Sequence, residues 1–288
     1  MHSLSLDAVL EELISDAVTL DEMGRKFQID LWSTAVEDAV LEYRIETRSH
    51  GPIEALLVIG QASEPRFNFL LGASQSPAVS HGHLADACGS LRALGVDHHV
   101  AVAPELAEAE LAEDWLSRNG YERRQRRARF LRNAAPPDFP EPPAIEVDEL
   151  TDFETEGECF SHLVVDGFGL GLSLATFYFE LPGKDGWRCY VAIDEKEAAV
   201  ACAAMRIEDG IAQLGLDATA EAARGRSCQL ALLRRRIVDA AAAGCHTLVA
   251  ETDEPLDEGA DPSGAARNLA RAGFDRVSLG IVWGPSAL

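Results

Sequence analysis

The sequence predicts an α/β protein, more closely α+β, built from two similar halves that each form a mixed, largely antiparallel sheet flanked by helices. Three observations support this prediction. The chain has 288 residues, which is long for one domain and comfortable for two. A proline-rich linker at 135–144 separates residues 1–134 from residues 145–288. The same order of strand and helix patterns occurs on both sides of that linker.

The first half alternates helix-like and strand-like patterns. Apolar residues three and four apart predict helices, and short runs of β-branched and aromatic residues predict strands. We expect helices at 7–17, 83–94 and 105–119, and strands at 41–48, 56–60, 67–72, 99–103 and 126–131. The linker follows, with five prolines in residues 134–144, and prolines keep a chain extended and deny it backbone donors.

The second half repeats this order. We expect strands at 190–193, 198–207, 211–216, 247–250 and 277–283, and helices at 229–243 and 265–272. Asp209 and Gly210 lie between two apolar runs and predict a hairpin turn. The passage from 211 to 250 runs strand, loop, helix, strand, which predicts a right-handed crossover.

Composition restricts the classes of partner. The net charge of −23 disfavours binding to nucleic acid and to anionic membranes, and no run is long and apolar enough for a membrane helix. The N-terminus lacks the basic start of a signal peptide, so a cytoplasmic location is expected. The strand-like segment 121–132 holds six arginines, which we interpret as partners of acidic side chains rather than as a nucleic-acid patch.

Cysteine and histidine spacing predicts no metal site. None of the six cysteines forms a C-x-x-C pair, and we expect buried, reduced thiols. The histidines include the pairs His81/His83 and His98/His99. Neither pair has a carboxylate or cysteine at ligand spacing, so surface or turn positions are expected.

The loop at 217–229 joins a strand to the start of a helix. Backbone N–H groups at a helix start lack intrahelical acceptors, and the helix dipole adds positive potential there. Arg224 and Arg226 add charge that could bind a phosphate. The helix also carries three arginines, expected on its solvent side: Arg234, Arg235 and Arg236. Spacing alone leaves two interpretations open, an anion site or a solvated, arginine-rich helix start.

Residues 186–274 resemble the GNAT superfamily of N-acetyltransferases, through the loop sequence RGRSCQ and the later sequence NLARAGF. The resemblance implies acetyl-CoA as co-substrate, with its pantetheine arm along the strand end and its pyrophosphate on backbone amides of an R-x-x-G-x-G/A loop. It also implies a cofactor contact from Asn268, whose other interpretation is a capping or turn residue. The residues implied to bind acetyl-CoA are Asp217, Ala218, Thr219, Arg224, Gly225, Arg226, Ser227, Cys228, Gln229 and Asn268.

The chain departs from the family pattern at several positions. Ser227 stands where glycine is usual, Gln229 where glycine or alanine is usual, and Glu221 where proline is common. Leu269 lies about where the family often has a tyrosine that protonates the leaving thiolate. Serine still offers a backbone N–H to a phosphate, but affinity falls if position 227 requires a positive φ.

Enzymes that resemble this chain work by direct attack of an amine on the thioester, so no nucleophilic triad is needed. A backbone N–H near Asp217–Thr219 would meet the thioester carbonyl. Asp217 and Glu251, each at a strand end, are the candidate bases. Their alternative interpretations are a loop or helix-entry cap for Asp217 and an exposed strand-end carboxylate for Glu251.

The acceptor region is expected near residues 165–172, which read VDGFGLGL and suggest a mobile loop between the first helices of the second half. Of the nearby aromatic residues, most are expected in the core and one or two along the acceptor pocket; they are Phe168, Phe177, Tyr178, Phe179 and Trp187. The first half resembles a degenerate GNAT-like domain, because 115–121 looks like a GNAT terminal helix while the run after Gly72 lacks the phosphate-binding pattern.

The sequence therefore predicts an acetyl-CoA-dependent N-acetyltransferase acting on an amine of a small molecule, amino acid or peptide. The alternative is a non-catalytic acyl-CoA-binding or interaction module. Partners are expected to be acetyl-CoA and the amine acceptor, with the protein a monomer or a homodimer.

Overall fold

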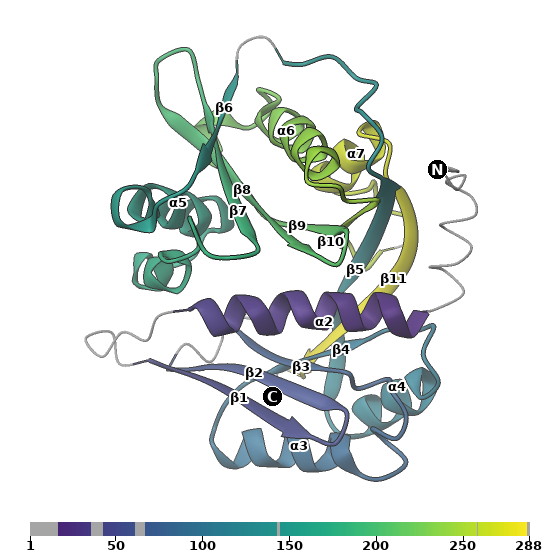
Figure 1. The fold of residues 1–288 in the computed structure, drawn as a ribbon. Helices are drawn as coiled ribbons and strands as arrows, with labels where there is room; N and C mark the ends of the chain where they lie inside the picture. The colour runs from purple at the N-terminus through teal and green to yellow at the C-terminus, as the bar shows by residue number, and fades with distance from the viewer. Residues whose placement is uncertain (1–16, 36–42, 61–66, 143–144, 258, 287–288) are drawn as a thin grey trace.

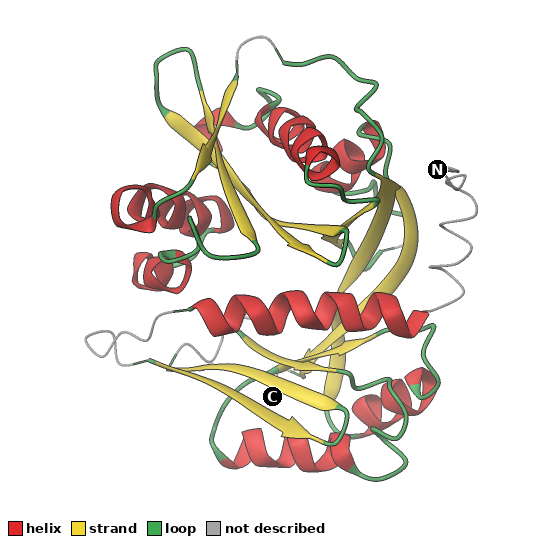
Figure 2. Cartoon of the chain, viewed as in Figure 1, coloured by secondary structure: helices red, strands yellow, loops and turns green. Residues whose placement is uncertain are grey.

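The computed structural model describes residues 17–35, 43–60, 67–142, 145–257 and 259–286. It shows a mixed α/β architecture in which helices cover both faces of one extended sheet (Figure 2). The predicted fold class is therefore confirmed. The helix expected at 7–17 lies, except for its last residue, outside the described residues.

The first half contains three helices and five strands among its described residues. They are α2 (Ala17–Thr34), β1 (Arg44–His50), β2 (Ile53–Ile59), β3 (Asn68–Leu71), α3 (His83–Ala93), β4 (His99–Val102), α4 (Ala109–Arg118) and β5 (Tyr121–Asn133). Each strand expected from the sequence is present, although β5 is much longer than expected. Helix α2 was missed, although Met23, Phe27 and Leu31 recur every four residues, which is helical spacing.

In the second half, the described residues form three α-helices, two 3₁₀ helices and six strands. They are β6 (Glu146–Leu150), α5 (Phe153–Phe168), η1 (Leu172–Tyr178), β7 (Trp187–Ile193), β8 (Ala199–Glu208), β9 (Ile211–Thr219), η2 (Glu221–Ala223), α6 (Cys228–Ala242), β10 (Thr247–Glu254), α7 (Gly264–Arg271) and β11 (Asp275–Pro285). Residues 165–168, expected in a loop, belong to α5, which ends at Gly169 with a φ of 66°.

Local turn chemistry accounts for the predicted hairpin. Strands β8 and β9 pair antiparallel, and Asp209 and Gly210 between them both have positive φ values, 48° and 77°. Two consecutive positive φ values match the right-handed twist of the flanking strands. Beyond α6, β10 pairs parallel with β9, which confirms the expected crossover connection. The described linker residues 134–142 contain neither helix nor strand.

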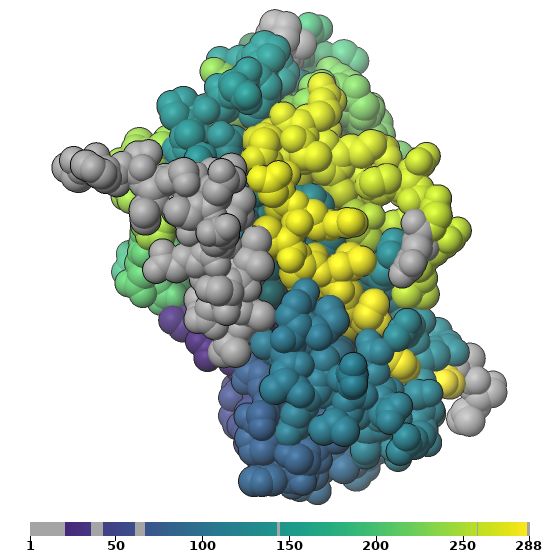
Figure 3. Space-filling view, turned by 90° about the vertical axis from the view of Figure 1, so that its right-hand side faces the viewer, coloured from purple at the N-terminus to yellow at the C-terminus, as the bar shows by residue number. Residues whose placement is uncertain are grey.

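Eleven strands form one sheet in the order β1-β2-β3-β4-β11-β5-β10-β9-β8-β7-β6. The pairs β3–β4 and β9–β10 are parallel, and the others are antiparallel. The two halves exchange their last strands: β5 of the first half lies between β11 and β10, whereas β11 lies between β4 and β5. Figure 3 shows the yellow C-terminal segment reaching into the blue-green first half.

Helix α2 runs between the two halves and contacts both (Figure 1). Phe27 and Leu31 belong to one buried cluster that includes Leu56 of β2 and Val164 of α5. Asp30 accepts hydrogen bonds from Trp187 Nε1 at 2.7 Å and from Arg206 Nε at 2.6 Å, both from the second half. The opposite face of the second half's sheet is covered by α6 and α7, and that of the first half by α3 and α4.

Candidate functional site

The parallel strands β9 and β10 separate part-way along the sheet. Their pairing is limited to Thr247–Ala250 of β10, which lie opposite residues 211–214 of β9. Beyond these residues β10 continues along β5, whereas β9 continues along β8. A bulge lies where they part: Leu216 has a φ of 54°, and the β8–β9 register shifts between Cys202 and Ala204. A bulge bends its strand and takes residues out of the regular ladder. The result is a wedge between the two strand ends.

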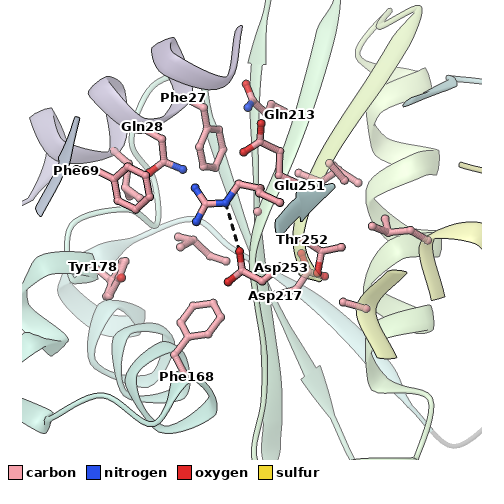
Figure 4. A pocket seen from close by; sticks show the side chains of 18 of the residues that line it. Phe27, Gln28, Phe69, Phe168, Tyr178, Gln213, Asp217, Glu251, Thr252 and Asp253 are labelled. Carbon is pink, nitrogen blue, oxygen red and sulfur yellow. Dashed lines mark hydrogen bonds and ion pairs between the residues drawn. The ribbon is translucent and has the colours of Figure 1, made fainter. Parts of the chain in front are cut away.

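A cleft of about 310 Å³ fills this wedge and extends toward α2. This volume lies at the lower end of the range for small-molecule sites. Asp217 of β9 and Glu251 of β10 face it from the sheet, and Gln229 of α6 and Leu269 of α7 line one end (Figure 4). The other end is formed by α2, the first half and η1, with the lining residues Phe27, Gln28, Leu31, Trp32, Leu56, Phe69, Leu71 and Tyr178.

Asp217 is paired with a buried arginine. Arg236 of α6 is fully buried and donates to both carboxylate oxygens, with Nη1 at 3.0 Å from Oδ2. Arg236 also donates to the carbonyl oxygens of Ala204 and Leu232. The prediction that Arg236 lies on the solvent side of its helix is therefore wrong, because α6 packs this side chain against the sheet. The pair fixes the position of the Asp217 side chain at the edge of the cleft.

Glu251 is also paired with an arginine. Arg129 of β5 donates from Nε to Oε1 at 2.8 Å, and both side chains are mostly buried. Burial alone would raise the pKa of Glu251, but the Arg129 and Arg127 guanidiniums outweigh it and hold this pKa below its ordinary value. Helix α2 crosses this pair at Gly24, where an added Cβ would lie 3.0 Å from Arg129 Nη2 and Glu251 Oε1.

The strand end beyond the bulge is covered by α5. Ala218 and Thr219 pair with Cys202 and Ala201 of β8. At Gly167 of α5, an added Cβ would lie 2.6 Å from the Ala218 Cβ and 2.9 Å from the Thr219 backbone nitrogen. Only glycine permits this close approach, so α5 fixes the position of the strand end.

The loop before α6 exposes the helix N-terminus. Gly225 and Ser227 have φ values of 79° and 65°, and Ser227 precedes the helix without a capping side-chain bond. A loop with two such residues turns successive N–H groups outward, as anion-binding loops do. Position 227 therefore has the positive φ on which the expected loss of phosphate affinity depends. A serine occupies this left-handed conformation, where glycine is usual. Cys228 is buried in the first turn.

The two loop arginines differ. Arg226 is bound to Asp194 of the β7–β8 turn, with Nη1 at 3.1 Å from Oδ2. Arg224 is exposed and reaches only the carbonyl oxygens of Thr219 and Gly167, each at 3.4 Å. Among the described residues, no carboxylate forms an ion pair with Arg224. Its charge is thus the more available one at this helix start.

Gln229 and Asn268 lie together where α6 and α7 meet. Asn268 Nδ2 donates to Gln229 Oε1 at 2.7 Å, and Gln229 lines the cleft. Ser263, rather than Asn268, caps α7, through a bond from the Ala266 N–H to its hydroxyl. The capping interpretation of Asn268 is therefore wrong, and its amide instead positions Gln229 at the cleft.

Two of the five aromatic residues near the acceptor region line the cleft, Phe168 and Tyr178, while Phe177 and Trp187 lie in the core. Tyr178 belongs to the core cluster as well, so three of the five are core residues, as expected for most of them; that the cleft receives the acceptor stays a prediction. Sequence reasoning missed the contributions of α2, β2 and β3, because these segments are remote in sequence and read only as core elements.

The equivalent loop of the first half contains its own anion. Glu108 is buried, and its carboxylate accepts from the backbone N–H groups of Val79 and Ser80 and from the Ser80 hydroxyl. Burial would raise the pKa of Glu108, but these hydrogen bonds lower it below its ordinary value. An internal carboxylate therefore occupies the position where the second half offers open N–H groups.

The remaining polar groups were partly anticipated. Four of the six arginines of β5 pair with carboxylates, as the acidic-partner interpretation predicted: Arg123, Arg124, Arg127 and Arg129. The other two, Arg126 and Arg132, donate to carbonyl oxygens. His98 is buried and bonded to Tyr121, so its expected surface position is wrong.

In the described part of the chain, no three His, Cys, Asp or Glu side chains form a metal-binding group, and no helix is long and apolar enough to cross a membrane.

Neither a family model nor a curated protein matches the sequence significantly, whereas solved structures do match the fold. A GCN5-related N-acetyltransferase from Kribbella flavida superposes with a TM-score of 0.61 at 17% identity, over 85% of this chain and 90% of that one. A GCN5-related N-acetyltransferase from Sphaerobacter thermophilus also gives 0.61, at 14% identity, over 82% and 78%. A tandem GNAT protein from the clavulanic acid biosynthesis pathway gives 0.54, at 13% identity, over 84% and 82%. The chain thus has a GNAT fold over most of its length.

Proposed function

We propose that this protein is an acetyl-CoA-dependent N-acetyltransferase that transfers the acyl group to an amine of a small molecule, amino acid or peptide. The observation that carries the proposal is the wedge between β9 and β10. One end of the wedge meets the open N-terminus of α6, and the other opens into the cleft. This arrangement suits an extended co-substrate with an anionic end and a reactive end.

The loop residues fit the anionic end. Backbone N–H groups of Gly225, Ser227, Cys228 and Gln229 would bind the pyrophosphate, and the exposed Arg224 would add charge. The Arg226 N–H instead donates to the Ala223 carbonyl oxygen at 3.3 Å. Beside this loop, Phe139 and Pro140 of the linker border a hollow of about 460 Å³, which offers room for the nucleotide end. Asn268 acts here through Gln229, to which it is bonded.

The strand end fits the reactive end. The thioester would lie along Asp217, Ala218 and Thr219, beyond the point at which β9 stops pairing with β10. Acetyl-CoA supplies an activated acyl group, and the protein orients the amine toward it and accepts the amine proton. Glu251 is the better-placed base of the two candidates, since Asp217 is held on both oxygens by the buried Arg236.

Thermal unfolding with and without acetyl-CoA tests the cofactor site. Binding to the native state raises stability by about 2.7 kcal/mol at a hundredfold excess over Kd, or a melting temperature higher by several degrees. Arg224→Ala should remove most of that rise while leaving the melting temperature of the free protein unchanged. Arg276→Ala, an exposed arginine on β11 that does not line the hollow beside the loop, serves as the matched control. No rise at millimolar acetyl-CoA would refute the proposal.

One observation favours the alternative of a non-catalytic acyl-CoA-binding module. Both candidate bases are paired with arginines, and the leucine at position 269 lies in the cleft where a proton donor would otherwise be expected. Both functions predict the thermal shift, so turnover separates them. Release of free thiol from acetyl-CoA that depends on an added amine supports the enzyme; binding without such release supports the module.

A further inference from the structure

Arg127 differs from the other arginines of its strand. Arg123, Arg124, Arg126, Arg129 and Arg132 each use a terminal guanidinium nitrogen in a contact with a carboxylate or a carbonyl oxygen. Arg127 donates only from Nε, to Asp253 Oδ1 at 3.3 Å, among the residues that the structure describes. Its two terminal nitrogens, which form the fork that binds carboxylates, make no hydrogen bond to a described residue.

This guanidinium belongs to the wall of the cleft. Arg127 lines the cavity, its side chain is 22% exposed, and its central carbon lies 5.1 Å from the centre of the Phe69 ring. The ring of Phe69 therefore supports the guanidinium from one side. Figure 4 shows Phe69, Gln28 and Asp253 around the same cavity.

The other charges of the cleft are already compensated within the protein. Asp217 is paired with Arg236, and Glu251 with Arg129. Asp253 accepts bonds from Gln125 and from Arg127 and is partly exposed. The terminal nitrogens of Arg127 are thus the charged donors in the cleft that lack an acceptor on the described protein, beside carboxylate oxygens able to receive an amine. The uncharged Trp32 Nε1 also lines the cleft and lacks an acceptor among the described residues.

Apart from Gln28 of α2, most of the acceptor end is apolar. Phe27 and Leu31 of α2, Leu56 and Phe69 of the first half, and Phe168 and Tyr178 of the second half line it. Aromatic side chains bury large apolar area on a ligand. The cavity holds only a small ligand beside an acyl-pantetheine arm, because about 310 Å³ is close to the minimum for such sites.

We propose that the acceptor is a small apolar α-amino acid, bound with its carboxylate on the terminal nitrogens of Arg127 and its side chain among these aromatic residues. The proposal rests on the acetyl-CoA-dependent transfer proposed above. A carboxylate carbon two bonds from the amine nitrogen places the amine beside Asp253 and Glu251, between the arginine and the β9 bulge. An internal peptide or protein amine lacks this carboxylate.

The transfer is balanced as follows. The amine, after losing its ammonium proton to a cleft carboxylate or water, attacks the thioester carbon with its lone pair. The carbon–sulfur bond breaks, the CoA thiolate leaves and takes a proton, and the nitrogen loses its second proton. The products are the N-acetyl amino acid and CoA thiol.

The test compares paired acceptors with and without the carboxylate. Thiol release from acetyl-CoA is measured with L-phenylalanine and L-leucine, with their decarboxylated counterparts phenethylamine and 3-methylbutylamine, and with the diamine putrescine. We expect kcat/KM for the amino acids to exceed that for their decarboxylated counterparts by about a hundredfold, since a site built to bind a polar group rejects analogues that lack it.

Variants separate recognition from folding. Arg127→Gln should lower kcat/KM for the amino acids about a hundredfold, leave the decarboxylated amines within a few-fold, and leave the acetyl-CoA thermal shift intact. Arg123→Gln, on the same strand but paired with Glu113 outside the cleft, should change none of these values. Arg127→Lys, which keeps the charge but loses the fork, should fall between wild type and Arg127→Gln.

Each outcome decides the proposal. Preference for the decarboxylated amines or for putrescine, or equal losses on all acceptors in Arg127→Gln, overturns it. A normal acetyl-CoA thermal shift without turnover of any apolar amino acid also overturns it, while cofactor binding stands. Absence of the acetyl-CoA shift in the wild type instead refutes the proposed function itself, so the two failures are distinguishable.

Discussion

Replacing Asp217 by asparagine should destabilise the protein through the arginine left behind. Arg236 is fully buried, and both carboxylate oxygens of Asp217 accept from it. Removing one partner of a buried ion pair costs about 3–5 kcal/mol, because the remaining charge is uncompensated. The Asp217 side chain is 23% exposed, so water reaches the pair and we expect the lower end, about 3 kcal/mol.

A double-mutant cycle isolates this effect. Arg236→Met fills a similar volume without charge. The double variant Asp217→Asn/Arg236→Met therefore has no uncompensated buried charge, and it should recover most of the lost free energy of unfolding. Urea unfolding at neutral pH, followed by far-ultraviolet circular dichroism, measures the four free energies. A loss below about 1 kcal/mol in the single variant, or no recovery in the double one, would refute the reasoning.

The same variants separate a structural from a chemical role for Asp217. Loss of a general base lowers kcat by about 10²–10⁴-fold whatever happens to stability. If Asp217 only fixes the strand end, the double variant should regain activity together with stability. Activity that stays at the level of the single variant in a restored fold would identify Asp217 as the base.

Three further predictions concern other parts of the molecule. Ser227→Gly should raise the free energy of unfolding by about 1 kcal/mol in urea titration, since position 227 has a φ of 65°, and it should not weaken the acetyl-CoA thermal shift. Burial, with nearby positive groups, lowers the pKa of His99 from 6.5 to about 4, so between these values the unfolded chain binds a proton that the folded protein does not. The free energy of unfolding should therefore fall as the pH falls below 6.5, by about 2 kcal/mol at pH 5, and His99→Phe should flatten this decline. Gly215→Ala would place a Cβ 2.6 Å from Phe27 Cζ, and should cost about 1–3 kcal/mol and weaken acetyl-CoA binding, with recovery in Gly215→Ala/Phe27→Leu.

The features that depend on neighbouring residues in the sequence were the most predictable. The turn at Asp209 and Gly210, the crossover to β10 and the loop at 224–229 follow from local signals, because glycine placement and apolar period act over a few residues. The wedge itself was not predicted. The bulge at Leu216 leaves no local mark, since leucine seldom adopts a positive φ.

The partners of the site residues could not be read from the chain. Arg236 was expected in solvent, because an arginine in a run of three on a helix normally is, and only the three-dimensional approach of α6 to Asp217 reveals its role. Arg127 looked like one of six equivalent arginines until the contacts of each could be compared. Helix α2 closes one side of the cleft although it lies some 190 residues before β9 in the sequence. The period of apolar residues within a segment cannot reveal such a contact.

The exchanged strands also govern how the protein can be made. Strand β4 emerges from the ribosome long before β11, the neighbour that covers its edge, and β5 likewise waits for β10 and β11. At about 5–20 residues per second, that edge stays uncovered for on the order of ten seconds or more during synthesis. An exposed strand edge invites pairing with other chains. The nascent first half therefore depends on chaperone protection or on the acidic character of the chain until the second half arrives, and neither half expressed alone should give a stable, complete sheet.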